Sequence, residues 1–99
     1  MLNNVVLVGR ICNDLSINET KSEKKVTNIT IAIPRNYKNE KGEYDTDFIS
    51  IVLWDKIAEN TKEYCKKGDI IGIKGRLQQE NKEIKIIAEK VTFLSSKRD

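Results

Sequence analysis

The residues of this sequence that are best suited to recognition chemistry are aromatic rings and cations. Phe48 and Trp54 lie six positions apart in one apolar stretch, and Tyr37 and Tyr44 flank Gly42 in a polar one. Aromatic faces stack on planar rings, and the unpaired bases of nucleic acids are bound in this way. This set of residues is therefore a candidate for a surface that stacks on bases, and the alternative for Tyr37 and Tyr44 is that they anchor a loop against the protein's own surface.

Basic side chains lie on the predicted strands or at their ends, where they can contact phosphates. Lys74 and Arg76 have the same strand parity, so both can line one groove. Phosphate contacts confer affinity without reading a base sequence. A solvated surface is the alternative explanation for any single lysine. The basic residues of this kind are Arg10, Arg35, Lys38, Lys56, Lys74, Arg76 and Lys85.

Catalysis is disfavoured, and we expect no catalytic residue, cofactor or metal. The chain has no histidine, and it contains neither a GxxxxGK[ST] nor a GxSxG motif. Cys12 and Cys65 are not part of a CxxC pair, which argues against a zinc site. The N-terminus has no basic stretch before an apolar run, and no segment is predicted to span a membrane. Together with cysteines that are expected to be reduced, this predicts a cytoplasmic protein without a membrane partner.

Five strands and one helix must position these residues within a single domain of 99 residues. Pro34 is expected to stop the second strand, and the polar residues 35–46 predict a long hairpin loop. Gly72 and Gly75 are expected to mark tight bends of the fourth strand. The predicted strands are 2–12, 26–34, 47–54, 69–78 and 83–94, and the predicted helix is 55–67.

The third strand carries the two large rings on one face. Ile49, Ile51 and Leu53 alternate with Phe48 and Trp54, so the isoleucines and the leucine can form the core while both rings point away from it. Two explanations remain open at this point. The rings either stack on bases, or they pack on a partner subunit or, for Trp54, in a corner beside the helix.

The helix is expected to begin at Asp55 as its N-cap and to end at Gly68, with lysines in its last turn. Its apolar stripe should cover one end of the sheet, with Tyr64 as a packing residue. Three strands, a helix and two strands predict a closed or nearly closed antiparallel barrel, which leaves no exposed edges. The stripe consists of Ile57, Thr61, Tyr64 and Cys65.

Several stretches together resemble the bacterial single-stranded DNA-binding protein family. The opening MLNNVVLVGRICND, the pair DFISIVLWDKIAEN and KKGDIIGIKGRLQ, and the closing AEKVTFL occur in the family's order over residues 1–94. The resemblance implies an all-β OB fold, a five-stranded antiparallel Greek-key barrel with its helix between the third and fourth strands. It also implies sequence-tolerant binding of single-stranded DNA in replication, repair or recombination, in the cytoplasm with the nucleoid.

The resemblance also implies roles for particular residues. Phe48 and Trp54 match base-stacking positions, and Tyr37 roughly matches another. Arg10 and Arg76 match basic positions near the groove. The segment from Leu2 to Val8 matches the strand that pairs subunits, with a homotetramer favoured over a homodimer. The predicted DNA-binding set is Phe48, Trp54, Tyr37, Arg10, Arg35, Arg76, Lys56 and Lys74.

Two departures from the family pattern modify these expectations. A tight turn around Asn81 replaces a long hairpin between the last two strands, which predicts a smaller site and weaker binding. Residues 95–99 form a short polar tail after the domain of residues 1–94, without the family's acidic tip, so recruitment of replication or recombination proteins is in doubt. The alternative is an OB adaptor similar to primosomal replication protein N, and a third is an OB module that binds only proteins.

Overall fold

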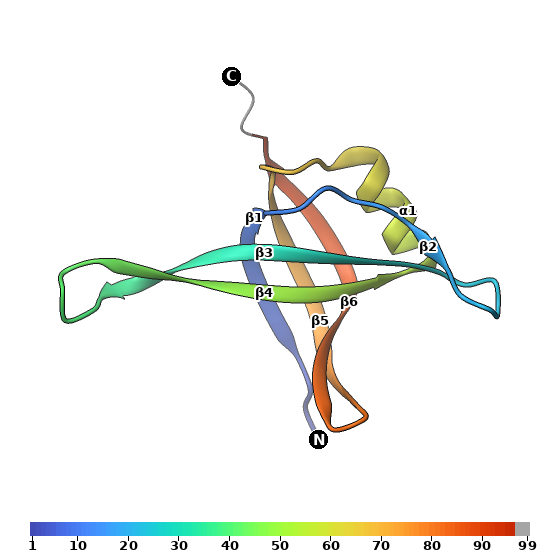
Figure 1. The fold of residues 1–99 in the computed structure, drawn as a ribbon, viewed down its shortest axis with the longest axis horizontal. Helices are drawn as coiled ribbons and strands as arrows, with labels where there is room; N and C mark the ends of the chain where they lie inside the picture. The colour runs from blue at the N-terminus through green and yellow to red at the C-terminus, as the bar shows by residue number, and fades with distance from the viewer. Residues whose placement is uncertain (97–99) are drawn as a thin grey trace.

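The strands carry alternating apolar residues and close into a barrel. A single helix packs on one end of this barrel. The computed structural model describes residues 1–96. Figure 1 shows two long hairpins that cross at the barrel and run out from it in different directions. The elements are β1 (Val5–Ile11), β2 (Asn18–Glu19), β3 (Lys25–Lys38), β4 (Tyr44–Trp54), α1 (Asp55–Tyr64), β5 (Ile70–Glu80) and β6 (Glu83–Ser95).

The five long strands pair in the order β1-β5-β6-β4-β3, and a further pairing of β1 with β3 closes the barrel. The OB fold class and the position of the helix are therefore confirmed. One detail differs from the expected all-antiparallel pairing, because β4 and β6 pair in parallel through Ile51 with Ile86 and Val52 with Ile87. The helix and β5 intervene between these strands, so β6 returns beside β4 in the same direction. The two-residue β2 is an additional short strand on β3.

Inward-facing residues of every long strand form the core. Ile29 and Ile31 of β3 and Ile51 and Leu53 of β4 are fully buried. Ile11, Ile71, Ile73 and Ala88 complete the cluster with residues of α1. The predicted alternation of β4 is thus confirmed, with Ile49 packed on the edge of the core.

The predicted loop of residues 35–46 is wrong, since most of it is strand. β3 continues to Lys38, β4 starts at Tyr44, and the pairing resumes at Lys38 with Tyr44 after an irregularity. Pro34 pairs with Thr46 at the start of this irregularity and does not end the strand. A proline is tolerated there because a bulge already interrupts the hydrogen-bond ladder. The hairpin thus forms a twisted ribbon, residues 34–46, beyond the barrel (Figure 1).

Helix α1 is shorter than predicted, and its caps differ. It ends at Tyr64, because Cys65 is extended and already buried. Trp54 is the N-cap and gives no side-chain cap hydrogen bond. Asp55, the predicted cap, has a φ of 49° and accepts a hydrogen bond at 3.1 Å from the backbone N–H of Lys25 instead. The start of the helix is thereby tied to the start of β3.

The buried face of the helix also differs in part from the predicted stripe. Ala58 and Thr61 are buried, Cys65 follows them into the core, and Ile57 packs at its edge. Tyr64 was expected to pack but is 68% exposed. Both cysteines are free, and burial raises the pKa of the Cys65 thiol. No helix within residues 1–96 is long and apolar enough to cross a membrane.

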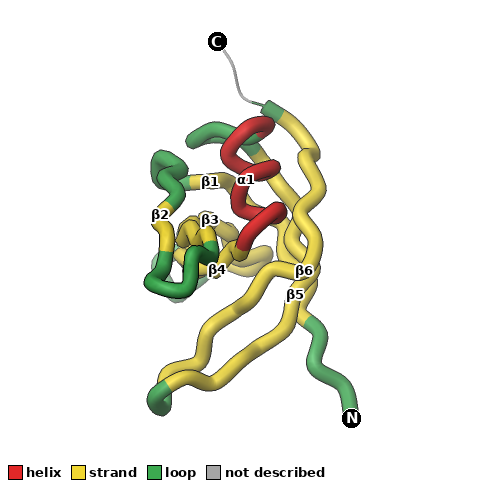
Figure 2. Tube along the Cα trace, turned by 90° about the vertical axis from the view of Figure 1, so that its right-hand side faces the viewer, coloured by secondary structure: helices red, strands yellow, loops and turns green. Residues whose placement is uncertain are grey.

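The last two strands also extend past the barrel, as a second ribbon (Figure 2). Their turn consists of Asn81 and Lys82, with φ values of 48° and 70°. Positive φ at both central residues is typical of the tight type I′ hairpin turn, so the short turn around Asn81 is as expected. The expectation that this turn replaces a long hairpin is wrong, because β5 and β6 stay paired up to Glu80 and Glu83. β6 runs to Ser95, and residues 97–99 of the predicted tail lie outside the described residues.

Of the two glycines expected to mark bends, only Gly75 lies at an irregularity of the β5–β6 pairing. A Cβ atom at Gly75 would overlap the backbone carbonyl of Ile87, whereas a Cβ atom at Gly72 would lie 3.6 Å from the Leu94 side chain. Gly75→Ala is therefore expected to lower the free energy of unfolding by about 1–3 kcal/mol, the usual cost of overpacking. Gly72→Ala is the matched control for urea unfolding. Equal midpoints and slopes for the two variants would contradict this reading of Gly75.

Candidate functional site

The outer face of β4 carries both predicted stacking residues. Phe48 is 67% exposed, and Trp54, at the end of the strand, is half-buried. Both rings lie on the face opposite the buried Ile51 and Leu53, about 20 Å apart at roughly 3.3 Å per residue. Between the two rings lie Ser50 and Val52, whose smaller side chains project less from this face. Phe48 is thus free to receive a planar ligand without disturbing the core.

Strand register extends this face from Phe48 across the barrel. Phe48 pairs with Ala32, and Ala32 pairs with Arg10 of β1. Residues that pair directly across strands point to the same side, so Phe48 and Arg10 share the outer face with the small Ala32 between them. The guanidinium of Arg10 donates a hydrogen bond at 2.7 Å to the carbonyl of Gly68, which holds the arginine along the surface.

Trp54 lies in a shallow pocket of about 240 Å³ that it shares with Arg76. The register explains their proximity, because Val52 pairs with Ile87 and Ile87 pairs with Arg76, placing β5 one strand beyond β6. Arg76 donates to Gln78, and Gln78 donates to Glu80, at 2.5 and 2.8 Å. The pocket thus combines a ring with two side chains that can donate hydrogen bonds, Arg76 and Gln78, and with the carboxylates of Asp55 and Glu80.

The other predicted cations are more scattered. Lys74 is exposed on β5 between Val6 and Lys90, on the same side of the strand as Arg76. Lys56 is exposed in the first turn of α1. Both are therefore accessible, but neither lines the pocket of Trp54 and Arg76.

Two of the predicted cations already have a carboxylate partner within the protein, since Lys85 lies 3.3 Å from Glu80 and Arg35 is held more extensively. Its guanidinium donates two hydrogen bonds to Asp47, at 3.2 and 2.9 Å, and lies 3.7 Å from Asp45. The hydrogen bonds from Arg35 lower the pKa of the Asp47 carboxyl. Asp47 pairs with Ile33, so Arg35 and its carboxylates occupy the face of the ribbon opposite Phe48. Strand parity could not predict this position of Arg35, because residues 35–46 were predicted to be a loop and not a continuation of the strand.

The ribbon also carries two exposed tyrosines. Tyr37 and Tyr44 are 61% and 58% exposed, and the Lys38 ammonium lies 5.9 Å from the centre of the Tyr44 ring. Tyr44 follows the parity of Phe48 along β4, so it continues the outer face onto the ribbon. Tyr37 lies on the ribbon beyond the barrel, in the irregular part of the pairing between Pro34 and Lys38.

Sequence reasoning missed the residues that shape the pocket around Trp54. Gln78 and Ile87 line it together with Lys24, from the turn before β3. These residues come from three separate segments, and only the parallel pairing of β4 with β6 brings them together. The one available signal was the shared parity of Arg76 and Gln78 on β5.

Comparison with known proteins places these features in one family. Residues 2–94 match the family described as the Single-strand binding protein family. The chain is 48% identical over 83 residues to a single-stranded DNA-binding protein of Streptococcus mutans, covering 84% of this chain and 51% of that one. It is 40% identical to single-stranded DNA-binding protein 1 of Streptococcus agalactiae, over 98% of this chain and 65% of that one. It is 38% identical to single-stranded DNA-binding protein B of Bacillus subtilis, over 98% and 94%. The chain thus spans about half to two thirds of the first two relatives.

Proposed function

This chain belongs to the single-strand binding protein family, and from that membership and the surface of β4 we propose that it binds single-stranded DNA without base-sequence preference. The observation that carries the proposal is the position of two rings, Phe48 and Trp54, on the outer face of one strand with Arg10 and Arg76 beside them. Stacking tolerates every base, and contacts to phosphates are equally independent of sequence. Protection of single strands during replication, repair or recombination follows from such binding.

We further propose that the protein acts by binding alone and lies with the nucleoid in the cytoplasm. The relatives named above are all single-stranded DNA-binding proteins, so an adaptor similar to primosomal replication protein N is not favoured. Contacts with replication or recombination proteins remain a secondary proposal.

The test is a fluorescence titration with oligo-dT at low and moderate salt. Trp54 is the single tryptophan, so any change in emission comes from the pocket beside Arg76. We expect quenching that weakens as salt is added, with little response to duplex DNA. Absence of both quenching and binding by an independent method would contradict the proposal.

We also propose that the subunits associate through β1, with a homotetramer favoured over a homodimer. β1 pairs with β5 from Val5 to Arg10 but with β3 only at Arg10 and Ile11. The second edge of its first residues is therefore unpaired, and Val6 and Val8 beside it are 75% and 53% exposed. Unpaired strand edges with apolar side chains favour pairing with another strand.

The ion pair of Arg35 leads to a prediction about affinity. Asp47→Asn removes the carboxylate that holds Arg35, so the freed guanidinium can contact a phosphate. We expect tighter binding and a salt dependence steeper by about 0.7 in logarithmic slope, the value for one added contact on a single strand. Combining this change with Arg35→Gln should return the slope to that of Arg35→Gln alone. An unchanged slope in Asp47→Asn would show that Arg35 has only a structural role in the ribbon.

A further inference from the structure

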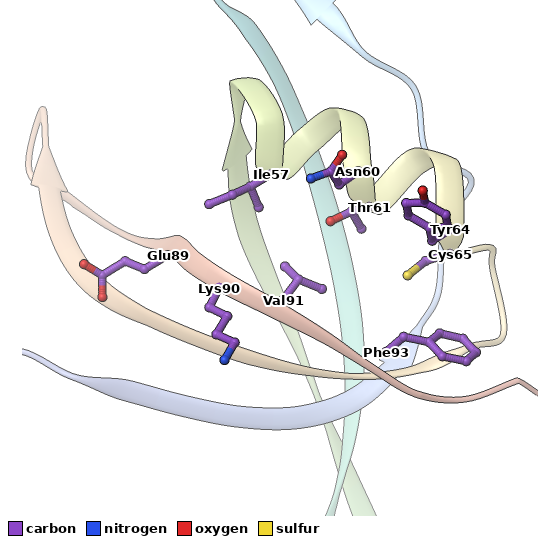
Figure 3. Close-up of a pocket in the computed structure, with 9 residues that line it drawn as sticks. All are labelled: Ile57, Asn60, Thr61, Tyr64, Cys65, Glu89, Lys90, Val91 and Phe93. Carbon is purple, nitrogen blue, oxygen red and sulfur yellow. The ribbon is translucent and has the colours of Figure 1, made fainter.

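A groove runs along α1 on the side that faces β6, and two aromatic rings stand on its opposite walls (Figure 3). Its volume is about 380 Å³. Tyr64 projects from the helix and Phe93 from the strand, and these rings are 68% and 47% exposed. Ile57 and Val91 form apolar walls further along, and Cys65 lies near the two rings. The groove therefore offers stacking faces that the surface of β4 does not use.

This groove follows the pocket of Trp54 along the same two elements. That pocket is bordered by Asp55 of α1 and Ile87 of β6, and the groove begins at Ile57 and Glu89, two residues further along each element. The two linings share no residue, and their succession along α1 and β6 is what links them. The two sites form one track between the same helix and the same strand.

A cluster of cations lies at the C-terminal end of α1, around Cys65. Cys65 also lines a third pocket, of about 340 Å³, whose walls include Lys62, Lys66 and Lys67. Among residues 1–96, these three lysines form no ion pair, in contrast to Lys25, whose ammonium lies 2.5 Å from a Glu59 oxygen. Three unpaired lysines within six positions, opposed in that pocket by Asp14 alone, complement a polyanion.

We propose that single-stranded DNA continues from the pocket of Trp54 along this helical track, with a base held by Tyr64 and Phe93 and phosphates on the lysines beyond Cys65. This inference rests on the proposed function and extends it to a second binding segment. A nucleic acid is the occupant that suits all three parts of the track, because it alternates planar apolar rings with anionic links. The rings and the apolar groove can bind the bases, and the cation cluster can bind the phosphates.

The test compares two lengths of oligo-dT, about 4 and about 16 nucleotides, the limits of the site size of one OB fold. Emission from Trp54 follows binding at the first pocket for both. For the variant Tyr64→Ala/Phe93→Ala we expect affinity for the long oligonucleotide to fall about 5- to 150-fold, which corresponds to one stacked base. Affinity for the short one should be unchanged, because it is held at Trp54.

Leu94→Ala is the matched control, since Leu94 is 49% exposed on the same strand and does not line the groove. A second variant, in which Lys62, Lys66 and Lys67 are all changed to Gln, leaves the apolar walls intact. Its salt slope for the long oligonucleotide should be lower by about 2, or roughly 0.7 for each lost contact.

The two proposals fail in different ways. If wild type quenches with both lengths and both variants keep the wild-type ratio of long to short affinities, the helical track carries no DNA and that inference is overturned. If wild type binds neither length, the proposed function itself fails. Loss of short and long binding together in a folded Tyr64→Ala/Phe93→Ala variant would also overturn the track as a separate segment.

Discussion

Replacing Phe48 and Trp54 together with alanine is expected to weaken binding of oligo-dT by about 2–6 kcal/mol, because each base stacked on a ring contributes about 1–3 kcal/mol. Phe48 is 67% exposed, so its loss removes little from the core. Trp54 is half-buried and lines its pocket together with Ile87, so its replacement also removes apolar surface there. The effect on affinity must therefore be measured together with the unfolding midpoint of each variant.

Anisotropy of a labelled oligonucleotide is the appropriate measurement, since the variant no longer contains tryptophan. Trp54→Phe is the matched control, because it keeps a ring at the same position and should retain most of the affinity. A folded double variant that binds as tightly as wild type would remove base stacking on β4 from the mechanism.

Changing Val6 to Lys is expected to disrupt the assembly of subunits. Val6 lies on the open edge of β1 and pairs with Lys74 of β5, so a new ammonium there finds a like charge instead of a partner. Lysine on an exposed edge is also a common means by which proteins prevent strand pairing. The molar mass measured by light scattering should fall toward the 11.4 kDa of a single chain.

Ile84→Lys is the control for that experiment, because Ile84 is 70% exposed on β6, close to the 75% of Val6. It makes the same chemical change at an equally exposed aliphatic residue away from β1. Association through β1 would be refuted if Val6→Lys kept the wild-type mass, or if the wild-type protein were already a single chain.

Strand alternation made much of the barrel predictable. Ile29, Ile31, Ile51 and Leu53 occupy alternate positions of their strands and are fully buried, and burial of this aliphatic face also fixes where Phe48 points. The same local rule could not show that β4 pairs in parallel with β6, since that depends on closure of the whole sheet. The strand that carries Trp54 could therefore be predicted from the sequence, but the residues that surround its ring could not.

The errors of prediction share another cause, competition between local signals and distant partners. Pro34 signals a strand end, but a paired strand absorbs it at an irregularity. Asp55 is a typical N-cap residue, but its carboxylate accepts a hydrogen bond from the backbone N–H of Lys25 instead. Arg35 signals a free cation, but Asp47 lies across the ribbon from it. Each competing partner comes from another segment, and the local sequence does not determine how that segment pairs.

The ribbon formed by residues 34–46 has a consequence for dynamics. Beyond Ile33 and Ile49 it has no buried residue among its described positions. Its contacts are ladder hydrogen bonds, exposed polar pairs of Arg35 and Asn39, and the contact of Lys38 with Tyr44. Segments with few buried contacts open with much smaller free energies than the core to which they are attached. Amide hydrogens of the ribbon should therefore exchange with solvent while those of Ile29 and Ile51 remain protected. The protein then consists of a rigid barrel and an adjustable arm, which can conform to an irregular strand without any cost to the barrel.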